Sequence, residues 1–218
     1  MFNPNESLMA LRDINIDICR GDKVGVIGNN GAGKSSLLRL IAGLYAPTEG
    51  EMIVNGQVTL LTALGMGMID ELTVEENIFL YGAICGLDRK LIKANLQEII
   101  DWAEVEGFAK AKLKTLSSGM RARVAFSTIR HVTAEITLMD EVLNAGDKNF
   151  RQKCRNVFEA YKNDSRTIIF ASHDIEFVRN VCTKALWLEK GQQKAFGDTE
   201  SVVKQYLGGE AVPATAQV

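Results

Sequence analysis

The 218-residue sequence lacks the features of several protein classes. It has no excess of one charge, because 25 basic side chains face 27 acidic ones, and it has no basic stripe that would attract nucleic acid. It has no apolar run near the roughly 20 residues that a membrane helix needs, since the longest candidate, residues 58–69, contains Gly65 and Gly67. The N-terminal MFNPNES has neither the basic nor the apolar part of a secretory signal. We therefore expect no nucleic-acid partner, no membrane span and no secretion signal.

Cysteine and histidine are too sparse and scattered for a disulfide framework or a zinc site. There are four cysteines without a Cys-x-x-Cys pair, and only two histidines. The cysteines are Cys19, Cys85, Cys154 and Cys182. We expect them to be small apolar fillers in a reducing compartment. An apolar fraction of 46% is ordinary for a protein with a real core.

The clearest chemistry lies in the stretch GNNGAGKS, which fits the phosphate-loop pattern of Gly, four residues, Gly, Lys and then Ser or Thr. Its glycines allow a tight turn that brings N–H groups to phosphate oxygens, and Lys34 adds a charge for the β- and γ-phosphates. The apolar run 23–27 before it predicts a buried strand, and residues 36–44 after it have helical spacing. We predict that ATP binds here with its phosphates at a helix N-terminus, and that the Ser35 hydroxyl ligates Mg²⁺. The predicted binding residues are Gly28, Asn29, Asn30, Gly31, Ala32, Gly33, Lys34, Ser35 and Ser36.

The stretch ITLMDE at 136–141 predicts a strand that ends in two acids. Asp140 at the strand end can hold Mg²⁺ through water, and Glu141 can polarise an attacking water. Many strands end in acidic turns, so this pattern alone is weak evidence for a catalytic site. Its place about a hundred residues after a phosphate loop favours the catalytic interpretation.

The stretch TIIFASHD at 167–174 predicts another strand, with His173 just beyond its carboxyl end. In parallel α/β sheets that edge carries the ligand site, so His173 could contact the γ-phosphate and orient the water. The alternative is an ordinary surface-loop histidine.

The stretch LSSGM at 116–120 predicts a turn that opens a helix. Ser117, Ser118 and Gly119 could offer hydroxyl and N–H donors to an anion. The same residues equally describe an ordinary helix cap.

The remaining pattern indicates an α/β fold. We predict a phosphate-loop NTPase core with a mostly parallel sheet and an inserted α-helical subdomain at about 72–132. We also predict an N-terminal antiparallel β subdomain, with alternating residues 13–18 as one strand and a hairpin of residues 51–54 and 57–61 around Asn55-Gly56. Residues 1–207 form one domain in this interpretation, and the small, polar tail 208–218 is expected to be disordered.

Together these stretches resemble the nucleotide-binding subunit of ATP-binding cassette (ABC) transporters, over about residues 10–207. The resemblance implies that Lys34 and Ser35 bind phosphate and Mg²⁺, and that Asp140 is the acidic partner of Mg²⁺. It implies that Glu141 is the catalytic base and His173 the switch histidine. It also implies that Ser117 and Gly119 belong to a signature turn, which in this family closes over ATP held by the other subunit.

Several stretches narrow the resemblance to the branch that exports lipid-linked O-antigen, capsule or teichoic acid. They are LSSGM followed by RARVAFS, DEVLNAGD at 140–147, FRQKC at 150–154 and LGMGMIDELTVEEN at 64–77. This branch implies a homodimer with ATP at its interface, under two copies of an integral membrane subunit, at the cytoplasmic face of the inner membrane. Direct binding of the glycan is not expected, since the sequence has no room for an added carbohydrate-binding domain.

The sequence departs from the wider family in two places. The usual loop glutamine near the γ-phosphate is missing, and its position falls near Leu64. Phe2 is the only aromatic residue near the expected adenine site. Two other functions stay open: the same ATPase serving another exported substrate, and a soluble cassette protein acting on DNA or ribosomes.

Overall fold

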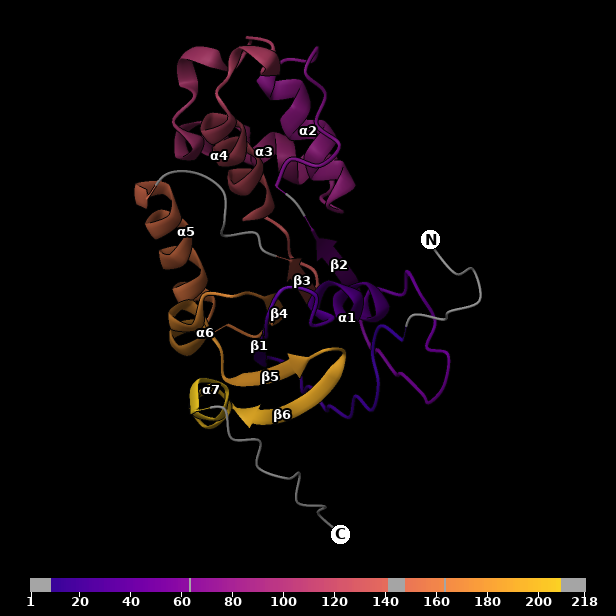
Figure 1. Ribbon diagram of the computed structural model, residues 1–218. Coiled ribbons are helices and arrows are strands. Elements are labelled where there is room, and N and C mark those ends of the chain that lie inside the picture. Colours follow the sequence, from indigo (N-terminus) through magenta and orange to yellow (C-terminus); the bar gives the residue numbers. More distant parts are fainter. Residues whose placement is uncertain (1–8, 63, 141–147, 163, 209–218) are drawn as a thin grey trace, which may run out of the picture.

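The computed structural model describes residues 9–62, 64–140, 148–162 and 164–208. Figure 1 shows an α/β body with a group of helices stacked above it. Six strands form one sheet in the order β2-β3-β4-β1-β5-β6, and every neighbouring pair is parallel except β5 and β6. The strands are β1 (Lys23–Ile27), β2 (Val58–Leu61), β3 (Ile136–Asp140), β4 (Thr167–Ala171), β5 (Lys184–Glu189) and β6 (Gln192–Asp198). A mostly parallel sheet was predicted, and it is confirmed.

The central strands are short apolar runs because helices cover both faces of the sheet. All five residues of β1 and of β4 are buried. Alternate residues enter two different apolar clusters: Ile169 of β4 packs with α1 (Lys34–Ile41), whereas Ile168 and Phe170 pack with α6 (Ile175–Val181). The sheet is therefore the middle layer of a three-layer arrangement, with α5 (Lys148–Tyr161) and α7 (Thr199–Gly208) on the α6 side.

Between β2 and β3 the described chain is helical. It forms α2 (Val74–Ile84), α3 (Arg89–Ala103) and α4 (Ser118–Ile129), with two short 3₁₀ turns at 106–108 and 113–115. The predicted capping box is present at the start of α2, where the Thr73 hydroxyl accepts a hydrogen bond from the Glu76 N–H and the Glu76 carboxylate accepts one from the Thr73 N–H. The apolar faces of these helices join the larger of the two core clusters, so the subdomain packs on itself and on the body.

The predicted N-terminal antiparallel strands are not formed within the described residues. Residues 13–18 alternate between half-buried and exposed, as expected, but they form no ladder with a described strand and contact β6 through a single hydrogen bond, from the Asn15 N–H to Gln193 Oε1 at 2.8 Å. Residues 51–54 form no strand, so the predicted hairpin around Asn55-Gly56 is absent; β2 pairs in parallel with β3 and is the edge strand of the sheet. The turn signal at Asn55-Gly56 is local, but a hairpin also needs a strand on each side of the turn, and only β2 forms. The antiparallel pair of this sheet is β5–β6.

Three predictions fall on residues that the structure does not describe: the catalytic base Glu141, the aromatic Phe2 and most of the tail, 209–218. Among the described residues, no helix is both long enough and apolar enough to cross a membrane.

Candidate functional site

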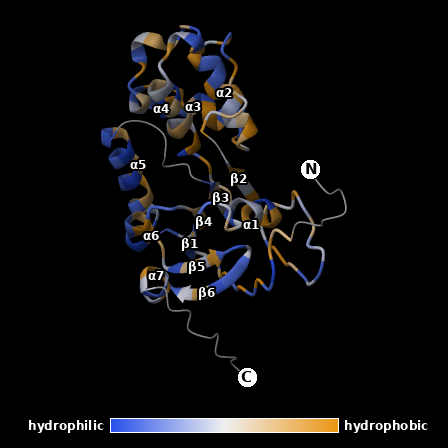
Figure 2. Cartoon of the chain, in the orientation of Figure 1, coloured by the Kyte–Doolittle hydropathy of each residue, from blue (hydrophilic) through white to orange (hydrophobic). Residues whose placement is uncertain are grey.

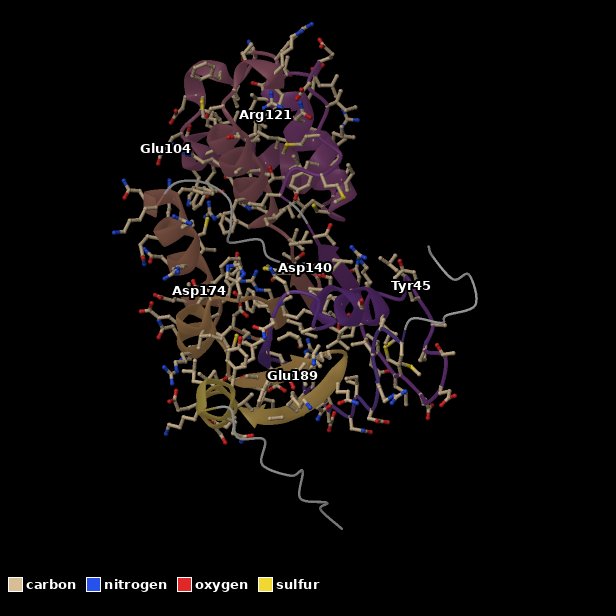
Figure 3. The ribbon with its side chains drawn as sticks, viewed as in Figure 1. Tyr45, Glu104, Arg121, Asp140, Asp174 and Glu189 are labelled. Carbon is tan, nitrogen blue, oxygen red and sulfur yellow. The ribbon has the colours of Figure 1, made fainter. Side chains whose placement is uncertain are left out.

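Three neighbouring strands bring the predicted site residues to one edge of the sheet. β3, β4 and β1 are adjacent and parallel, with Asp140 paired to Ala171 and Val26 also paired to Ala171. Parallel strands end at the same edge, so Asp140, the residues after Ala171 and the phosphate loop after Ile27 lie side by side there. Figure 3 shows Asp140 at this edge, below the helical subdomain.

Two glycines of the phosphate loop lie so close to neighbouring residues that a side chain would not fit there. A Cβ on Gly28 would lie 2.1 Å from the Leu188 carbonyl oxygen, and Gly28 has φ 144°. A Cβ on Gly33 would lie 2.8 Å from Leu11, at φ 102°. Only glycine combines this backbone shape with this closeness, so the loop is seated against β5 and the segment around Leu11.

Helix α1 starts without a side-chain cap. Gly33 is its N-cap residue and makes no side-chain hydrogen bond, and Asn29 and Asn30 before it are exposed. The first N–H groups of a helix have no partner inside the helix, and the helix dipole is positive there. The start of α1 can therefore receive an anion such as a phosphate group. Ser35 and Ser36, both half-buried, lie in this first turn.

The Lys34 ammonium lies over the loop that precedes it. Lys34 is only 6% exposed, and its Nζ donates to the Gly28 carbonyl oxygen at 2.8 Å and to the Asn29 carbonyl oxygen at 3.2 Å. Among the described residues it has no carboxylate partner. Its charge is thus placed inside the loop without an internal counter-charge, as a site for a polyanion requires.

Asp140 has an oxygen that suits a cation. Its Oδ1 is buried and accepts no hydrogen bond from the described part of the chain, although buried carboxylate oxygens are normally paired. Carboxylate and hydroxyl oxygens are the ligands that Mg²⁺ prefers, and Ser35 lies on the first turn of α1. The Ser35 hydroxyl and the Asp140 carboxylate are therefore residues whose chemistry fits a Mg²⁺ ion.

His173 is exposed just beyond β4, and the loop that carries it is held from two sides. Ser172 Oγ accepts a hydrogen bond from the Asp174 N–H at 3.0 Å, and Asp174 caps α6 by accepting from the Phe177 N–H at 3.0 Å. The Asp174 carboxylate also pairs with Arg155 of α5. Nothing local in the sequence of α5 indicates this role of Arg155, because its partner lies on another element.

The predicted signature turn lies far from the phosphate loop of the same chain. Ser117 is the N-cap of α4, and its Oγ accepts from the Met120 N–H at 3.2 Å. Ser117 and Ser118 are exposed, and Arg121 in the next turn pairs with Asp70 at 2.5 Å. In Figure 3 Arg121 lies high in the helical subdomain, whereas Asp140 lies at the sheet. The structure thus gathers the phosphate loop, Asp140 and His173 but not Ser117, Ser118 and Gly119.

One further residue that shapes the site was missed by sequence reasoning. The Asn77 side chain is fully buried, accepts from the Ile69 N–H at 2.7 Å and donates to the carbonyl oxygens of Ile69, Leu72 and Thr73. It thereby fixes the loop before α2, in which the family's glutamine position falls. An asparagine on the apolar face of a predicted helix was the signal that could have found it.

Comparisons with known proteins agree with this geometry. The family model described as "ABC transporter" matches residues 11–144. The chain therefore belongs to the ABC transporter family. Two solved structures share the fold at low identity: an ATP-binding subunit of an ABC transporter (TM-score 0.76, 23% identical, covering 93% of this chain and 89% of that one) and a dimeric ATP-binding cassette bound to ADP and Pi (TM-score 0.74, 24% identical, covering 91% and 94%).

Several curated relatives with named functions are similar to most of this chain. A "Teichoic acids export ATP-binding protein TagH" of Shouchella clausii (strain KSM-K16) is 39% identical over 90% of this chain and 54% of its own length. "O-antigen export system ATP-binding protein RfbB" is 37% identical in Myxococcus xanthus, over 91% of this chain and 46% of that protein, and 36% identical in Klebsiella pneumoniae, over 91% and 80%. The chain spans about half the length of the first two of these relatives.

Proposed function

We propose that the protein is the ATP-hydrolysing subunit of an exporter that moves a lipid-linked surface polysaccharide across the inner membrane. The observation that carries the ATPase part is the buried Lys34 charge inside a glycine loop, at the same sheet edge as the Asp140 oxygen that accepts no hydrogen bond from the described residues. The polysaccharide part is supported by relatives named for teichoic acid and O-antigen export.

Each predicted catalytic residue has a defined task in this proposal, including Glu141, which lies outside the described residues. The N–H groups at the start of α1 and Lys34 bind the β- and γ-phosphates, and Ser35 and Asp140 hold Mg²⁺, which neutralises the phosphate charge when bound. Glu141 takes the proton of the attacking water, and His173 orients that water against the γ-phosphate. The Arg155–Asp174 pair fixes the loop from which His173 projects.

A single subunit surrounds only one side of the triphosphate, so we propose composite sites in a homodimer. Ser117, Ser118 and Gly119 are accessible at the α4 N-terminus but lie away from the phosphate loop of their own chain. A two-fold axis brings the signature turn of one subunit to the ATP of the other, and it does so twice. One solved neighbour is a dimeric cassette bound to ADP and Pi, in keeping with this arrangement.

The loop and helix at 64–85 provide a surface for the membrane subunit. Met66, Ile69 and Ile84 are exposed by 60%, 48% and 56%, which is unusual for large apolar side chains on one short stretch. In this proposal two copies of the membrane subunit contact these surfaces from the bilayer side. The ATPase then works as a peripheral protein at the cytoplasmic face and does not touch the glycan.

The test is reconstitution with a candidate membrane subunit, sought among the neighbouring genes. The isolated protein should be a weak ATPase, and the rate should rise when the verified complex is placed in lipid. Met66→Ser and Ile84→Ser should reduce this stimulation without changing the rate of the isolated protein. No stimulation of a verified complex in any lipid would contradict the transport function while leaving ATP hydrolysis itself untouched.

A further inference from the structure

The segment FRQKC at 150–154 opens α5, and the proposed chemistry gives it no task. Figure 2 shows α5 as a largely hydrophilic helix, and its backbone packs on α6 rather than on the subdomain above it. Side chains of this segment nevertheless reach the helical subdomain. Phe150 packs edge-on against Trp102 and Phe126, with ring centroids 5.9 and 5.8 Å apart.

Glu104 stands in a strained position at the end of α3. It is the residue that ends the helix, and it adopts the left-handed conformation at φ 58°. Glycine is the usual residue for this conformation, because a Cβ makes it unfavourable. The Glu104 carboxylate lies 2.7 Å from Arg123 of α4 and 3.0 Å from Lys153 of α5. The strain thus places one carboxylate between two cations on two other helices.

Lys153 makes the complementary contacts from the α5 side. Its ammonium donates to the Trp102 carbonyl oxygen at 2.8 Å, pairs with Glu104 and lies 4.3 Å from the centroid of the Trp102 ring. A carbonyl oxygen in the last turn of a helix and the face of an aromatic ring both attract a cation. We call the set Trp102, Glu104 and Lys153 the α5 latch. Figure 3 shows Glu104 at the top of α5, where the two parts of the molecule meet.

We propose that the α5 latch positions the helical subdomain so that the signature turn can reach the ATP of a partner subunit; this rests on the ATP-driven pairing proposed above. The subdomain is joined to the body by two chain passages, before α2 and after α4, so its tilt depends on side-chain contacts such as these. The latch holds α4 through Arg123, and Ser117 starts that same helix. Two residues further along α5, Arg155 pairs with Asp174 beside His173, so one helix contacts both the helical subdomain and the His173 loop.

The sharpest test is Glu104→Gly, because glycine favours the left-handed position and the fold should not suffer. We expect an unchanged or higher melting temperature and an unchanged affinity of the monomer for ATP. We expect ATP-dependent dimerisation in a Glu141→Gln background to weaken about tenfold, the size of effect that losing such charged contacts produces. In a Trp187→Phe protein, Trp102 should be quenched more readily by acrylamide.

Lys153 provides a matched series. Lys153→Met should reproduce the loss of dimerisation and the easier quenching, and Lys153→Arg should restore both, since arginine keeps the charge, the donors and the contact with the ring. Lys162→Met, which removes an exposed lysine just beyond the same helix, is the control and should change neither.

The two proposals fail in different ways. If the unsubstituted protein does not dimerise with ATP, the proposed composite site is wrong. Quenching of Trp102 and hydrogen exchange of α3 and α4 then still show whether the latch holds the helical subdomain. If Glu104→Gly and Lys153→Met leave quenching, exchange and dimerisation at the unsubstituted level, the latch is overturned.

Discussion

Lys23 and Lys34 stand at the two ends of the segment formed by β1 and the phosphate loop, and both are buried, but among the described residues only Lys23 has a carboxylate beside it. Lys23 Nζ lies 3.5 Å from Asp164 and donates to the carbonyl oxygens of Gly21, Asp164 and Arg166. Lys34 contacts the carbonyl oxygens of Gly28 and Asn29 and, within the described part of the chain, no carboxylate. Burying a charge is costly unless it is paired. The described residues therefore supply a counter-charge for Lys23 but none for Lys34, as a binding site for a polyanion requires.

Lys34→Ala is expected to abolish ATP hydrolysis while the fold is retained. The reason is the loss of the cation that faces the β- and γ-phosphates, and the rate should fall by about a hundredfold or more. Phosphate release and circular dichroism measure the two effects. Arg39→Ala, an exposed cation later in the same helix, is the control and should keep normal turnover. A folded Lys34→Ala protein with normal turnover would refute the site.

Glu141→Gln is expected to bind ATP, cleave it very slowly and accumulate as a dimer, because the proposed base is lost while both phosphate loops remain filled. Adding Ser117→Arg should dissolve these dimers, since it places bulk and charge where the partner's γ-phosphate lies. Size-exclusion chromatography with ATP and Mg²⁺ distinguishes the two. A Glu141→Gln protein that stays monomeric with bound ATP at high concentration argues against composite sites.

Asp164→Asn is expected to lower the free energy of unfolding at neutral pH by about 1–2 kcal/mol. This is less than the loss of a fully buried ion pair would cost, because the Asp164 side chain is 30% exposed and Lys23 keeps its carbonyl partners. Burial by itself raises the pKa of Asp164, but hydrogen bonds from Arg166 and the charge of Lys23 outweigh it and leave that pKa below 3.8. A carboxylate with a lowered pKa stabilises the fold above its unfolded pKa and loses this effect as the pH falls through the folded one.

The difference between Asp164→Asn and the unsubstituted protein should therefore be constant above about pH 5 and shrink as the pH falls further and the carboxylate is protonated. Urea unfolding at several pH values measures it. A difference that stays constant into strong acid would show that the Asp164 charge does not contribute.

The native protein is expected to show one rapidly reacting thiol, and the unfolded protein all four. Only Cys19 is exposed, while burial raises the pKa of Cys85 to about 11 and that of Cys154 to about 12. Burial raises the pKa of Cys182 as well. The thiolate is the reactive form, so buried, protonated thiols react slowly. Titration with a thiol reagent, with Cys19→Ser as the control that should remove the fast phase, checks this; a second fast thiol would contradict it.

Much of the fold was predictable because its signals are local. The buried strands, the helix after the phosphate loop and the Thr73–Glu76 capping box depend on neighbours in sequence, and the structure has them. The N-terminal strands were not predictable, because a strand exists only where a partner forms a ladder with it. The alternation at 13–18 correctly gave the side that faces the core, but among the described residues no strand forms a ladder with this segment, and residues 51–54 form no strand beside β2.

The sequence by itself determined the phosphate loop, since a turn of glycines with a lysine and a serine at fixed spacing has its chemistry within eight residues. It also favoured one sheet edge for Asp140 and His173, because parallel strands must end there together. Only the tertiary structure decided which charges meet: Lys23 with Asp164, Arg155 with Asp174, and Glu104 with Lys153. The partners in these pairs lie 19 to 141 residues apart in the sequence. Local residue preferences do not specify the packing of helices and strands that brings such distant charges together.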